Sequence, residues 1–273
     1  MEGYSDEFDR ISVEGVLSCG LTLPEGIHIQ ILETTTSTND VAKQRAAEGA
    51  AACTVVLAEQ QTRGKGRLGR QFYSPPASGV YLSMILRPKL RENKLMLLTT
   101  AVAVASTEAI EAVRDCTVLI KWVNDLYLHG KKIAGILVEA GPDYAVVGIG
   151  VNVRPSVEGF PLELAGKAGA LCESHESISR NRLAAELIAR VWETAQNLED
   201  RYEATSFIIA REARRRSCVL GREVLIRGHS QLTRARAVDI DPNGFLIVRD
   251  SDGQDHVLFT GEISLDPGDG LSW

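Results

Sequence analysis

Residues 121–139 read Lys-Trp-Val-Asn-Asp-Leu-Tyr-Leu-His-Gly-Lys-Lys-Ile-Ala-Gly-Ile-Leu-Val-Glu. The apolar residues predict strands over 118–122 and 133–139, and His129-Gly130 predicts a turn between them. Charged and polar side chains in such buried surroundings need partners, because an unpaired buried charge is strongly destabilising. The segment therefore predicts a sheet that carries a polar site.

Four side chains of this segment are candidates for that site: Lys121, Asn124, Asp125 and Lys132. Together they offer oxygen acceptors for a metal or a ribose and an ammonium for a carboxylate. Strand alternation lets only one of Lys131 and Lys132 face the site, and we assign Lys132, which directly precedes the apolar strand. Taken singly, an Asn-Asp pair is also typical of a turn, and a lysine at a strand edge is usually solvated.

A second segment, Arg63-Gly-Lys-Gly-Arg-Leu-Gly-Arg70, places four cations and three glycines in eight residues. Glycine lets backbone amides approach an anion closely, and Lys and Arg neutralise it. The segment lacks the Gly-Lys-Ser/Thr end of a Walker loop, and no helix pattern follows it as a Rossmann fingerprint requires. It predicts a loop that binds phosphate; a solvated turn and an RGG-like nucleic-acid contact are the alternatives.

Two further motifs could hold polar ligands. Ser37-Thr38-Asn39 opens a predicted helix, where hydroxyls and free amides either bind a small polar molecule or simply cap the helix. In Gly148-Ile-Gly-Val-Asn152 the glycines permit close approach of a ligand, and Asn152 could reach a phosphate or its metal. A tight strand end is the alternative for this second motif.

The remaining patterns divide the chain into a short lead segment (1–26), a larger domain (27–216) and a small β-domain (217–273). In the larger domain, strands are also predicted over 27–32, 54–58, 79–86 and 144–151. Helices are predicted from about residue 36 to Gly49, over 94–113, and from Ser179 through Tyr202. Short strands alternate with turn sequences in the small domain, over 223–226, 233–238, 245–248 and 257–259.

Composition restricts the partners and the compartment. A net charge of −6 disfavours binding to nucleic acid or to an anionic membrane, so the positive charge that matters is local. The acidic residues Met1–Arg10 lack the chemistry of a signal or transit peptide, and no apolar run is long enough to span a bilayer. The five scattered cysteines predict reduced thiols in the cytoplasm.

Five motifs occur in the order seen in biotin protein ligases: Ser37-Thr-Asn39, Gln61-Thr-Arg-Gly-Lys-Gly-Arg67-Leu-Gly-Arg70, Lys121-Trp-Val-Asn-Asp125, Lys132-Ile-Ala-Gly-Ile-Leu and Gly148-Ile-Gly-Val-Asn152. The chain resembles that family from about Ile31 to Leu265, including its closing Gly261-Glu-Ile-Ser-Leu265. Each motif is weak alone, but the ordered set is specific.

The resemblance implies an α+β fold, in which a mixed sheet flanked by helices, related to class II aminoacyl-tRNA synthetases, precedes an SH3-like C-terminal barrel. It also implies the reaction: biotin and Mg-ATP form biotinyl-5'-AMP, and biotin then passes to a lysine of a biotin carboxyl carrier protein. By matching position, the resemblance implies that the following residues contact biotin or the adenylate: Ser37, Thr38, Asn39, Gln61, Gly64, Lys65, Gly66, Arg67, Lys132 and Gly135.

Within that set Lys132 and Arg67 are the predicted catalytic residues. The residues that the resemblance places near ATP and its metal are Arg70, Asp125 and Asn152. We expect no permanent metal site; Mg²⁺ would bind together with ATP, near Asp125 and Asn152. The chain departs from the family pattern at Lys65, where an arginine is usual, and at Arg63 and Val123, where a small residue and a proline are common.

Two rivals share this resemblance. A lipoate or octanoyl ligase has the same catalytic fold, but the C-terminal barrel and the paired motifs favour biotin. A biotin-sensing transcriptional regulator carries a DNA-binding domain before the Ser-Thr-Asn motif, where this sequence has only about 30 residues, too few for a winged helix, and these are acidic. We therefore expect a monofunctional, cytoplasmic ligase, monomeric or homodimeric, that binds neither nucleic acid nor a membrane.

Overall fold

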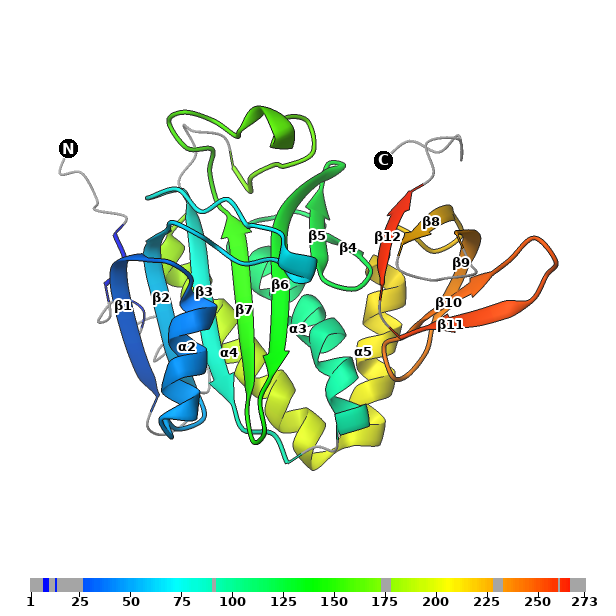
Figure 1. Cartoon of the computed structure of the whole chain (residues 1–273), viewed down its shortest axis with the longest axis horizontal. Coiled ribbons are helices and arrows are strands. Elements are labelled where there is room, and N and C mark those ends of the chain that lie inside the picture. Colours follow the sequence, from blue (N-terminus) through cyan, green and yellow to red (C-terminus); the bar gives the residue numbers. More distant parts are fainter. Residues whose placement is uncertain are drawn as a thin grey trace.

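The computed structural model describes residues 7–9, 13, 27–89, 92–172, 178–227, 233–259 and 261–265. These ranges form a seven-stranded mixed sheet with helices on both faces, followed by a five-stranded antiparallel sheet (Figure 1). The predicted fold class is confirmed.

The strands of the large sheet lie in the order β1-β2-β3-β7-β6-β5-β4. Only β1 and β2 are parallel; all other neighbours are antiparallel. The interior strand β3 is buried at every position and mostly apolar, because helices cover both of its faces. The strand bounds are β1 His28–Thr35, β2 Thr54–Gln61, β3 Gly79–Leu86, β4 Leu119–Lys121, β5 Asp125–Leu128, β6 Lys131–Ala140 and β7 Ala145–Asn152.

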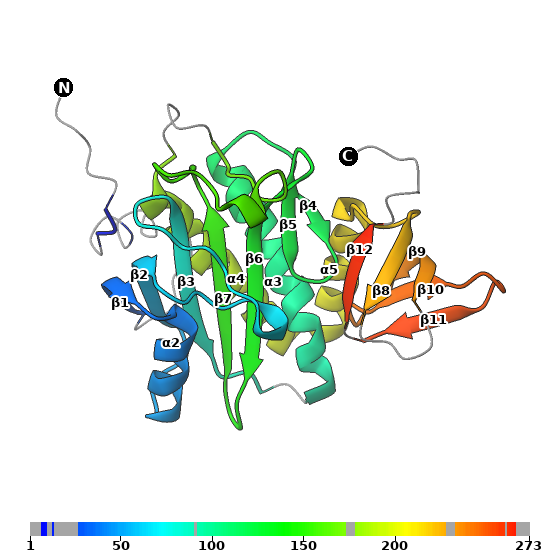
Figure 2. The same cartoon turned by 45° about the horizontal axis from the view of Figure 1, so that its top comes forward.

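One helix, α2 (Thr38–Ala47), covers one face of this sheet, while α3 (Glu92–Val113) and α4 (Arg180–Asp200) cover the other (Figures 1 and 2). A further helix, α5 (Tyr202–Arg216), packs against α3 and α4 and reaches β4. The ligand-binding motifs lie on the α2 side, where a single helix leaves part of the sheet uncovered.

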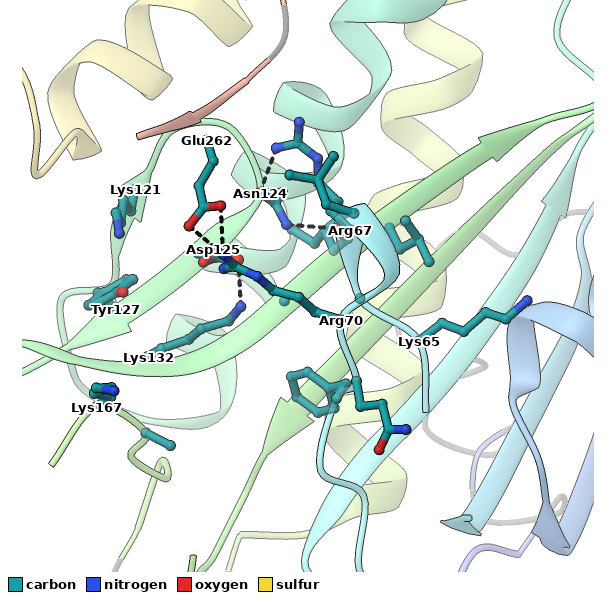
Figure 3. Close-up of a pocket in the computed structure, with 18 of the residues that line it drawn as sticks. Lys65, Arg67, Arg70, Lys121, Asn124, Asp125, Tyr127, Lys132, Lys167 and Glu262 are labelled. Atoms are coloured by element: carbon teal, nitrogen blue, oxygen red, sulfur yellow. Dashed lines mark hydrogen bonds and ion pairs between the residues drawn. The ribbon is translucent and has the colours of Figure 1, made fainter. Parts of the chain in front are cut away.

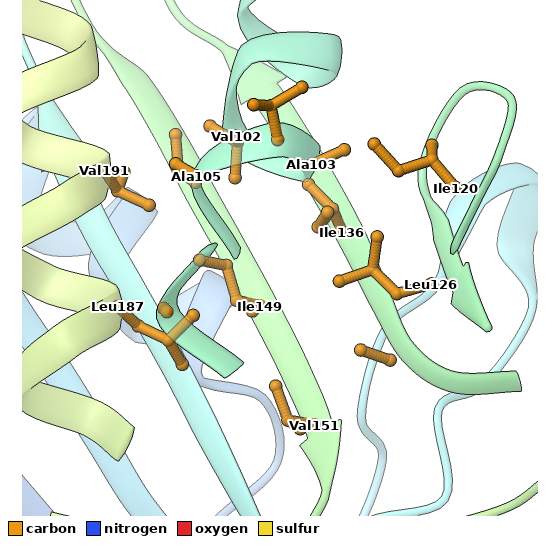
Figure 4. Packing of buried hydrophobic residues seen from close by; sticks show 14 of the residues in the cluster. Val102, Ala103, Ala105, Ile120, Leu126, Ile136, Ile149, Val151, Leu187 and Val191 are labelled. Carbon is orange, nitrogen blue, oxygen red and sulfur yellow. The ribbon is translucent and has the colours of Figure 1, made fainter. Parts of the chain in front are cut away.

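Strand alternation divides the core into two clusters. Val56, Ile85 and Val146 face α2. On the opposite face Ile149 packs against Leu187 of α4, within the larger cluster shown in Figure 4. Full burial of each such aliphatic side chain contributes about 1.5–3 kcal/mol. This packing makes the sheet a rigid support for the site.

Three features of the large domain differ from the sequence prediction. Strand β5 was not predicted, because its four residues, Asp-Leu-Tyr-Leu, follow an Asn that favours a turn. The helix predicted from Ser179 through Tyr202 corresponds to α4 and ends at Asp200; the backbone leaves the helical region at Arg201, and α5, which begins at Tyr202, was not predicted. Ser37 does stand at the N-cap of α2, but its side chain forms no capping hydrogen bond.

The small domain consists of β8 Glu223–Arg227, β9 Arg234–Ile240, β10 Leu246–Arg249, β11 Asp255–Leu258 and β12 Glu262–Leu265. Its sheet order is β11-β10-β9-β8-β12, so β12, which was not predicted as a strand, returns to pair with β8. This pairing brings the end of the described chain back beside the large domain (Figure 1).

A glycine turn joins the two domains behind the site. Trp122 donates its indole N–H to the carbonyl oxygen of Gly244 at 2.9 Å. Gly244 has a φ of +81°, and a Cβ there would lie 2.7 Å from Oγ1 of Thr100. Only glycine suits both conditions, so this turn fixes the small domain against β4 and α3.

Part of the predicted lead segment is packed into the larger domain. Phe8 is buried against the guanidinium of Arg180, with 4.6 Å between its ring centroid and Cζ. The side chain of Asn181 accepts from the backbone N–H of Asp9 and donates to the carbonyl oxygen of Glu7, each at 3.0 Å. The other residues of 1–26 lie outside the described ranges, apart from the fully buried Val13.

In the described ranges, no helix combines the length and apolar character needed to cross a bilayer. Cys53, Cys116, Cys172 and Cys218 are free thiols, whereas Cys19 lies outside the described residues. Burial raises the pKa of Cys53 and of Cys218 to about 12, so neither thiol is a ready nucleophile.

Candidate active site

Two adjoining cavities lie where the basic loop crosses the sheet. The larger, of about 290 Å³, lies between the loop, strands β4 to β6 and the start of β12. The smaller, of about 20 Å³, lies between the N-terminus of α2, β3 and β7. Lys65, Phe72, Gly135 and Leu137 line both cavities, so a bound molecule could extend from one into the other.

Hydrogen bonds among buried polar side chains organise the smaller cavity. Gln61, at the end of β2, accepts from the backbone N–H of Thr38 at 2.8 Å and from its hydroxyl at 3.1 Å. Ser83 donates to Oγ1 of Thr38 at 2.8 Å and to Oδ1 of Asn39 at 2.6 Å. Gln61 therefore satisfies the amide of Thr38, the first of the α2 amides that have no partner within the helix.

Asn39 is fixed from the other side as well. Its amide donates to Oε2 of Glu139 at 3.0 Å, and Lys43 donates to the other carboxylate oxygen at 2.8 Å. A Cβ on Gly148 would lie 2.0 Å from Oδ1 of Asn39, so glycine is required there. The predicted residues Ser37, Thr38, Asn39 and Gln61 thus meet around one small, polar cavity.

The basic loop folds on itself between β2 and β3. The amide of Gly66 donates to the carbonyl of Arg70 at 2.8 Å, and that of Phe72 donates to the carbonyl of Gly64 at 2.9 Å. Leu68, at the tip, adopts a left-handed φ of 56° and is exposed. The loop is therefore an ordered turn. Its cations Lys65, Arg67 and Arg70 line the larger cavity, whereas Arg63 and Gly64 line neither cavity.

Three cations of the loop, Lys65, Arg67 and Arg70, have separate partners. Lys65 forms a short ion pair with Asp40 of α2. Arg67 donates to Oδ1 of Asn124 at 3.0 Å and to the carbonyl oxygen of Gly261 at 3.2 Å. Burial lowers the pKa of Arg67, which remains a cation because its ordinary pKa is far above neutrality.

Lys132 occupies the middle of the larger cavity (Figure 3). Its ammonium lies 2.7 Å from Oδ1 of Asp125. Its Nζ would lie 3.4 Å from a Cβ on Gly135, the glycine that lines both cavities. Lys131 is exposed and lines neither cavity, so strand alternation selected the correct lysine of the pair.

The larger cavity carries an excess of positive charge. Six cationic side chains line it, against two carboxylates, those of Asp125 and Glu262. The cations are Lys65, Arg67, Arg70, Lys121, Lys132 and Lys167. In a chain whose net charge is −6, this local excess of positive charge favours a polyanionic ligand such as a nucleoside triphosphate.

Asn152, like Gly64, is a predicted site residue that lines neither cavity. The amide of Asn152 donates to the carbonyl oxygen of Gly169 at 2.9 Å. Among the described residues, no cluster of three His, Cys, Asp or Glu side chains could hold a metal ion. A divalent cation in the larger cavity would therefore rely on Asp125 or Glu262 together with phosphate oxygens of the ligand.

The sequence indicated Asn124 and Lys121 as candidates for the site but gave neither a specific contact. It assigned no role to two other residues of the site, Glu262 and Phe72. Glu262 belongs to the closing motif of the chain, and nothing in the local sequence indicates that it contacts the basic loop. Phe72 lines both cavities, but an aromatic residue after a loop is also a common core residue.

Comparisons with known proteins agree with this geometry. Residues 31–154 match the biotin/lipoate A/B protein ligase family, and residues 219–266 match the biotin protein ligase C terminal domain. The biotin--[acetyl-CoA-carboxylase] ligase of Mycobacterium tuberculosis is 31% identical over 247 residues, which cover 86% of this chain and 88% of that protein. The chain belongs to the biotin protein ligase family.

Other relatives are longer. The bifunctional ligase/repressor BirA of Bacillus subtilis is 36% identical over 154 residues, or 55% of this chain and 47% of that protein. The chain thus spans about half the length of the bifunctional relatives that it matches.

Solved structures show the same fold. The biotin protein ligase of Aquifex aeolicus in complex with biotin and ATP is 26% identical and superposes with a TM-score of 0.74 over 88% of this chain and 98% of that one. The Leishmania major enzyme in complex with biotinyl-5-AMP is 25% identical, with a TM-score of 0.58 over 86% of this chain and 99% of that one.

Proposed function

We propose that this protein activates biotin with ATP to biotinyl-5'-AMP and transfers biotin to a lysine of a biotin carboxyl carrier protein. The observation that carries the proposal is the junction of a small polar cavity with a cationic one at Gly135, beside Lys132. An acyl adenylate needs this arrangement, because its acyl part is compact and uncharged whereas its nucleotide part is anionic.

The chemistry requires no nucleophilic side chain. The biotin carboxylate attacks the α-phosphate, a new O–P bond forms, and the bond between the α-phosphate and the bridging oxygen breaks, so pyrophosphate leaves with that electron pair. The protein contributes positioning and charge stabilisation. Aligning two bound reactants can contribute on the order of 7–11 kcal/mol.

Lys132 is placed to stabilise the charge that develops between the carboxylate and the α-phosphate. Its present partner Asp125 lies at 2.7 Å, so the ammonium is already held at the junction before a ligand arrives. Arg67 and Lys65 lie on the loop above this point, where they would hold the adenylate and keep water from its reactive anhydride. Arg70, at the rim, would meet the phosphates.

Mg²⁺ would enter with ATP and neutralise part of the phosphate charge. Asp125 is the carboxylate that best fits this role, since it lines the larger cavity and sits beside Lys132. A cytoplasmic location, a monomeric or homodimeric state and the lack of nucleic-acid binding stay predictions from the sequence.

Incubation with biotin, Mg-ATP and a carrier domain, followed by mass spectrometry, tests the proposal directly. We expect biotinyl-lysine on the carrier and release of pyrophosphate. Parallel reactions with lipoate and octanoate test the rival ligases, because the matching catalytic family includes lipoate ligases. Pyrophosphate release with lipoate but not with biotin would overturn the proposal.

A further inference from the structure

Lys121, the last residue of β4, lines the larger cavity but differs from Lys132 and Arg70 in its partners. Among the described residues it forms no ion pair with a carboxylate. The two nearby carboxylates already have cationic partners: Asp125 is bound to Lys132 at 2.7 Å, and Glu262 is bound to Arg70 at 2.6 Å. Lys121 therefore keeps a positive charge that no carboxylate in the site neutralises.

The surroundings of Lys121 make an unneutralised charge energetically unfavourable. Its ammonium lies 5.7 Å from the ring centroid of Tyr127, and Trp122 follows it in the chain. Burial lowers the pKa of Lys121, while the charges of Asp125 and Glu262 raise it and that of Lys132 lowers it. By contrast Lys167, the other lysine of this cavity without a carboxylate partner among the described residues, is exposed to solvent.

Position along the site indicates which ligand group would meet this charge. Lys121 lines only the larger cavity, whereas the acyl group is expected in the smaller one. Figure 3 shows Lys65 at one end of the labelled residues and Lys121, with Tyr127 and Lys167, at the other, while the ammonium of Lys132 lies between them beside Asp125. In phosphoryl transfer the attacking and leaving oxygens lie roughly in line across the phosphorus atom.

An attack from the smaller cavity at a phosphorus beside Lys132 therefore sends the leaving group toward Lys121. We propose that Lys121 binds the β- and γ-phosphates of ATP and the departing pyrophosphate. This inference rests on the proposed function and assigns Lys121 to the first half-reaction only. Transfer of biotin from the finished adenylate involves no diphosphate, so Lys121 has no part in it.

Binding of inorganic pyrophosphate to the full chain, measured by calorimetry without biotin or ATP, is the primary test. Lys121→Met is expected to weaken pyrophosphate binding about 30-fold, the scale of one charge-assisted contact, while AMP affinity changes by less than about twofold. Lys131→Met is the matched control, because Lys131 opens β6 of the same sheet but lies outside the cavity; it is expected to change neither affinity. Lys121→Arg, which keeps the charge, is expected to retain most of the pyrophosphate affinity.

The half-reactions give a second readout. Lys121→Met is expected to slow biotin-dependent pyrophosphate release about 30-fold and to transfer biotin from preformed biotinyl-AMP within about twofold of the unaltered chain. Normal transfer also shows that the variant is folded. Unchanged pyrophosphate affinity, or an equal loss in both half-reactions, would overturn the inference. If the unaltered chain releases no pyrophosphate with biotin, the proposed function fails, whatever Lys121→Met does.

Discussion

Arg70 and Glu262 join the basic loop to the last strand of the small domain. Nη2 of Arg70 lies 2.6 Å from both carboxylate oxygens of Glu262, although 192 residues separate the two in sequence. Next to this pair, Arg67 donates to the carbonyl oxygen of Gly261. The small domain thus holds the loop over the larger cavity, and we expect these contacts to affect how long the adenylate stays bound.

Glu262→Gln should therefore speed dissociation of biotinyl-AMP. The Arg70 side chain is 60% exposed, and exposed ion pairs contribute only about 0–1 kcal/mol to stability, so the midpoint of unfolding should barely move. The off-rate is expected to rise by about fivefold or less, the kinetic equivalent of that energy. Stopped-flow dissociation of preformed adenylate measures it. An unchanged off-rate would show that the ion pair does not restrain the loop.

Lys132→Ala should abolish adenylate formation and leave the fold intact. The side chain lies in the cavity rather than in the core, and its loss frees Asp125, which adds a negative charge where phosphate must bind. Pyrophosphate release should fall by at least about a hundredfold, while the circular dichroism spectrum stays the same. Near-normal release would rule out the assigned role.

Arg67→Gly should weaken retention of the adenylate. The variant loses both the contact with Asn124 and the contact with Gly261, as well as the charge facing the ligand. We expect the off-rate of biotinyl-AMP to rise by about ten- to a hundredfold, more than for Glu262→Gln. Equal off-rates for the Arg67 variant and the unaltered chain would contradict closure of the loop.

Gly148→Ala should impair biotin binding by displacing Asn39. The added methyl group would lie 2.0 Å from Oδ1 of Asn39, which Ser83 and Glu139 hold in place. We expect the KM for biotin to rise at least about tenfold, equivalent to about 1.4 kcal/mol. Gly135→Ala is the comparison, since its methyl group would come no closer than 3.4 Å to another atom. A larger rise in the KM for biotin in Gly135→Ala than in Gly148→Ala would contradict this prediction.

Glu111 should make stability depend on pH. Its carboxylate accepts from Arg216 at 2.6 and 2.8 Å and from the amide of Val118 at 3.0 Å. Burial raises its pKa, but these hydrogen bonds outweigh that effect and the pKa lies below its ordinary value of 4.5. The stabilisation is therefore fully present above the ordinary value and is lost as the pH falls through the lower pKa of the folded state.

Glu111→Gln is the corresponding variant. At pH 7 it should lower the free energy of unfolding by about 2 kcal/mol, because Arg216 is left without its carboxylate. Urea unfolding at pH 7 and near pH 3 measures the difference in free energy of unfolding between the variant and the unaltered chain. This difference should be smaller at the lower pH. A difference that stays constant with pH would exclude ionisation of Glu111 as the cause.

Local sequence patterns were sufficient to predict most of the strands and to identify the motifs. The continuous apolar run of β3 is typical of a strand buried on both faces, and alternation places Lys131 and Lys132 on opposite faces. Prediction failed where local preference was weak or misleading. The break at Arg201 carries no Pro or Gly, and α5 is a polar sequence that buries only a few of its residues.

The sequence by itself determined the family, most of the helices and strands and the residue types of the site, because these depend on side-chain chemistry and short-range periodicity. It also indicated the basic loop and the lysine that faces the cavity. Only the tertiary structure decided which partners these residues have. Gln61 rather than Ser37 serves the first amide of α2, Asn152 turns to Gly169 instead of the cavity, and Glu262 holds Arg70. Such pairings join strands and loops that are far apart in the chain, and packing of the sheet against its helices and the small domain brings them together.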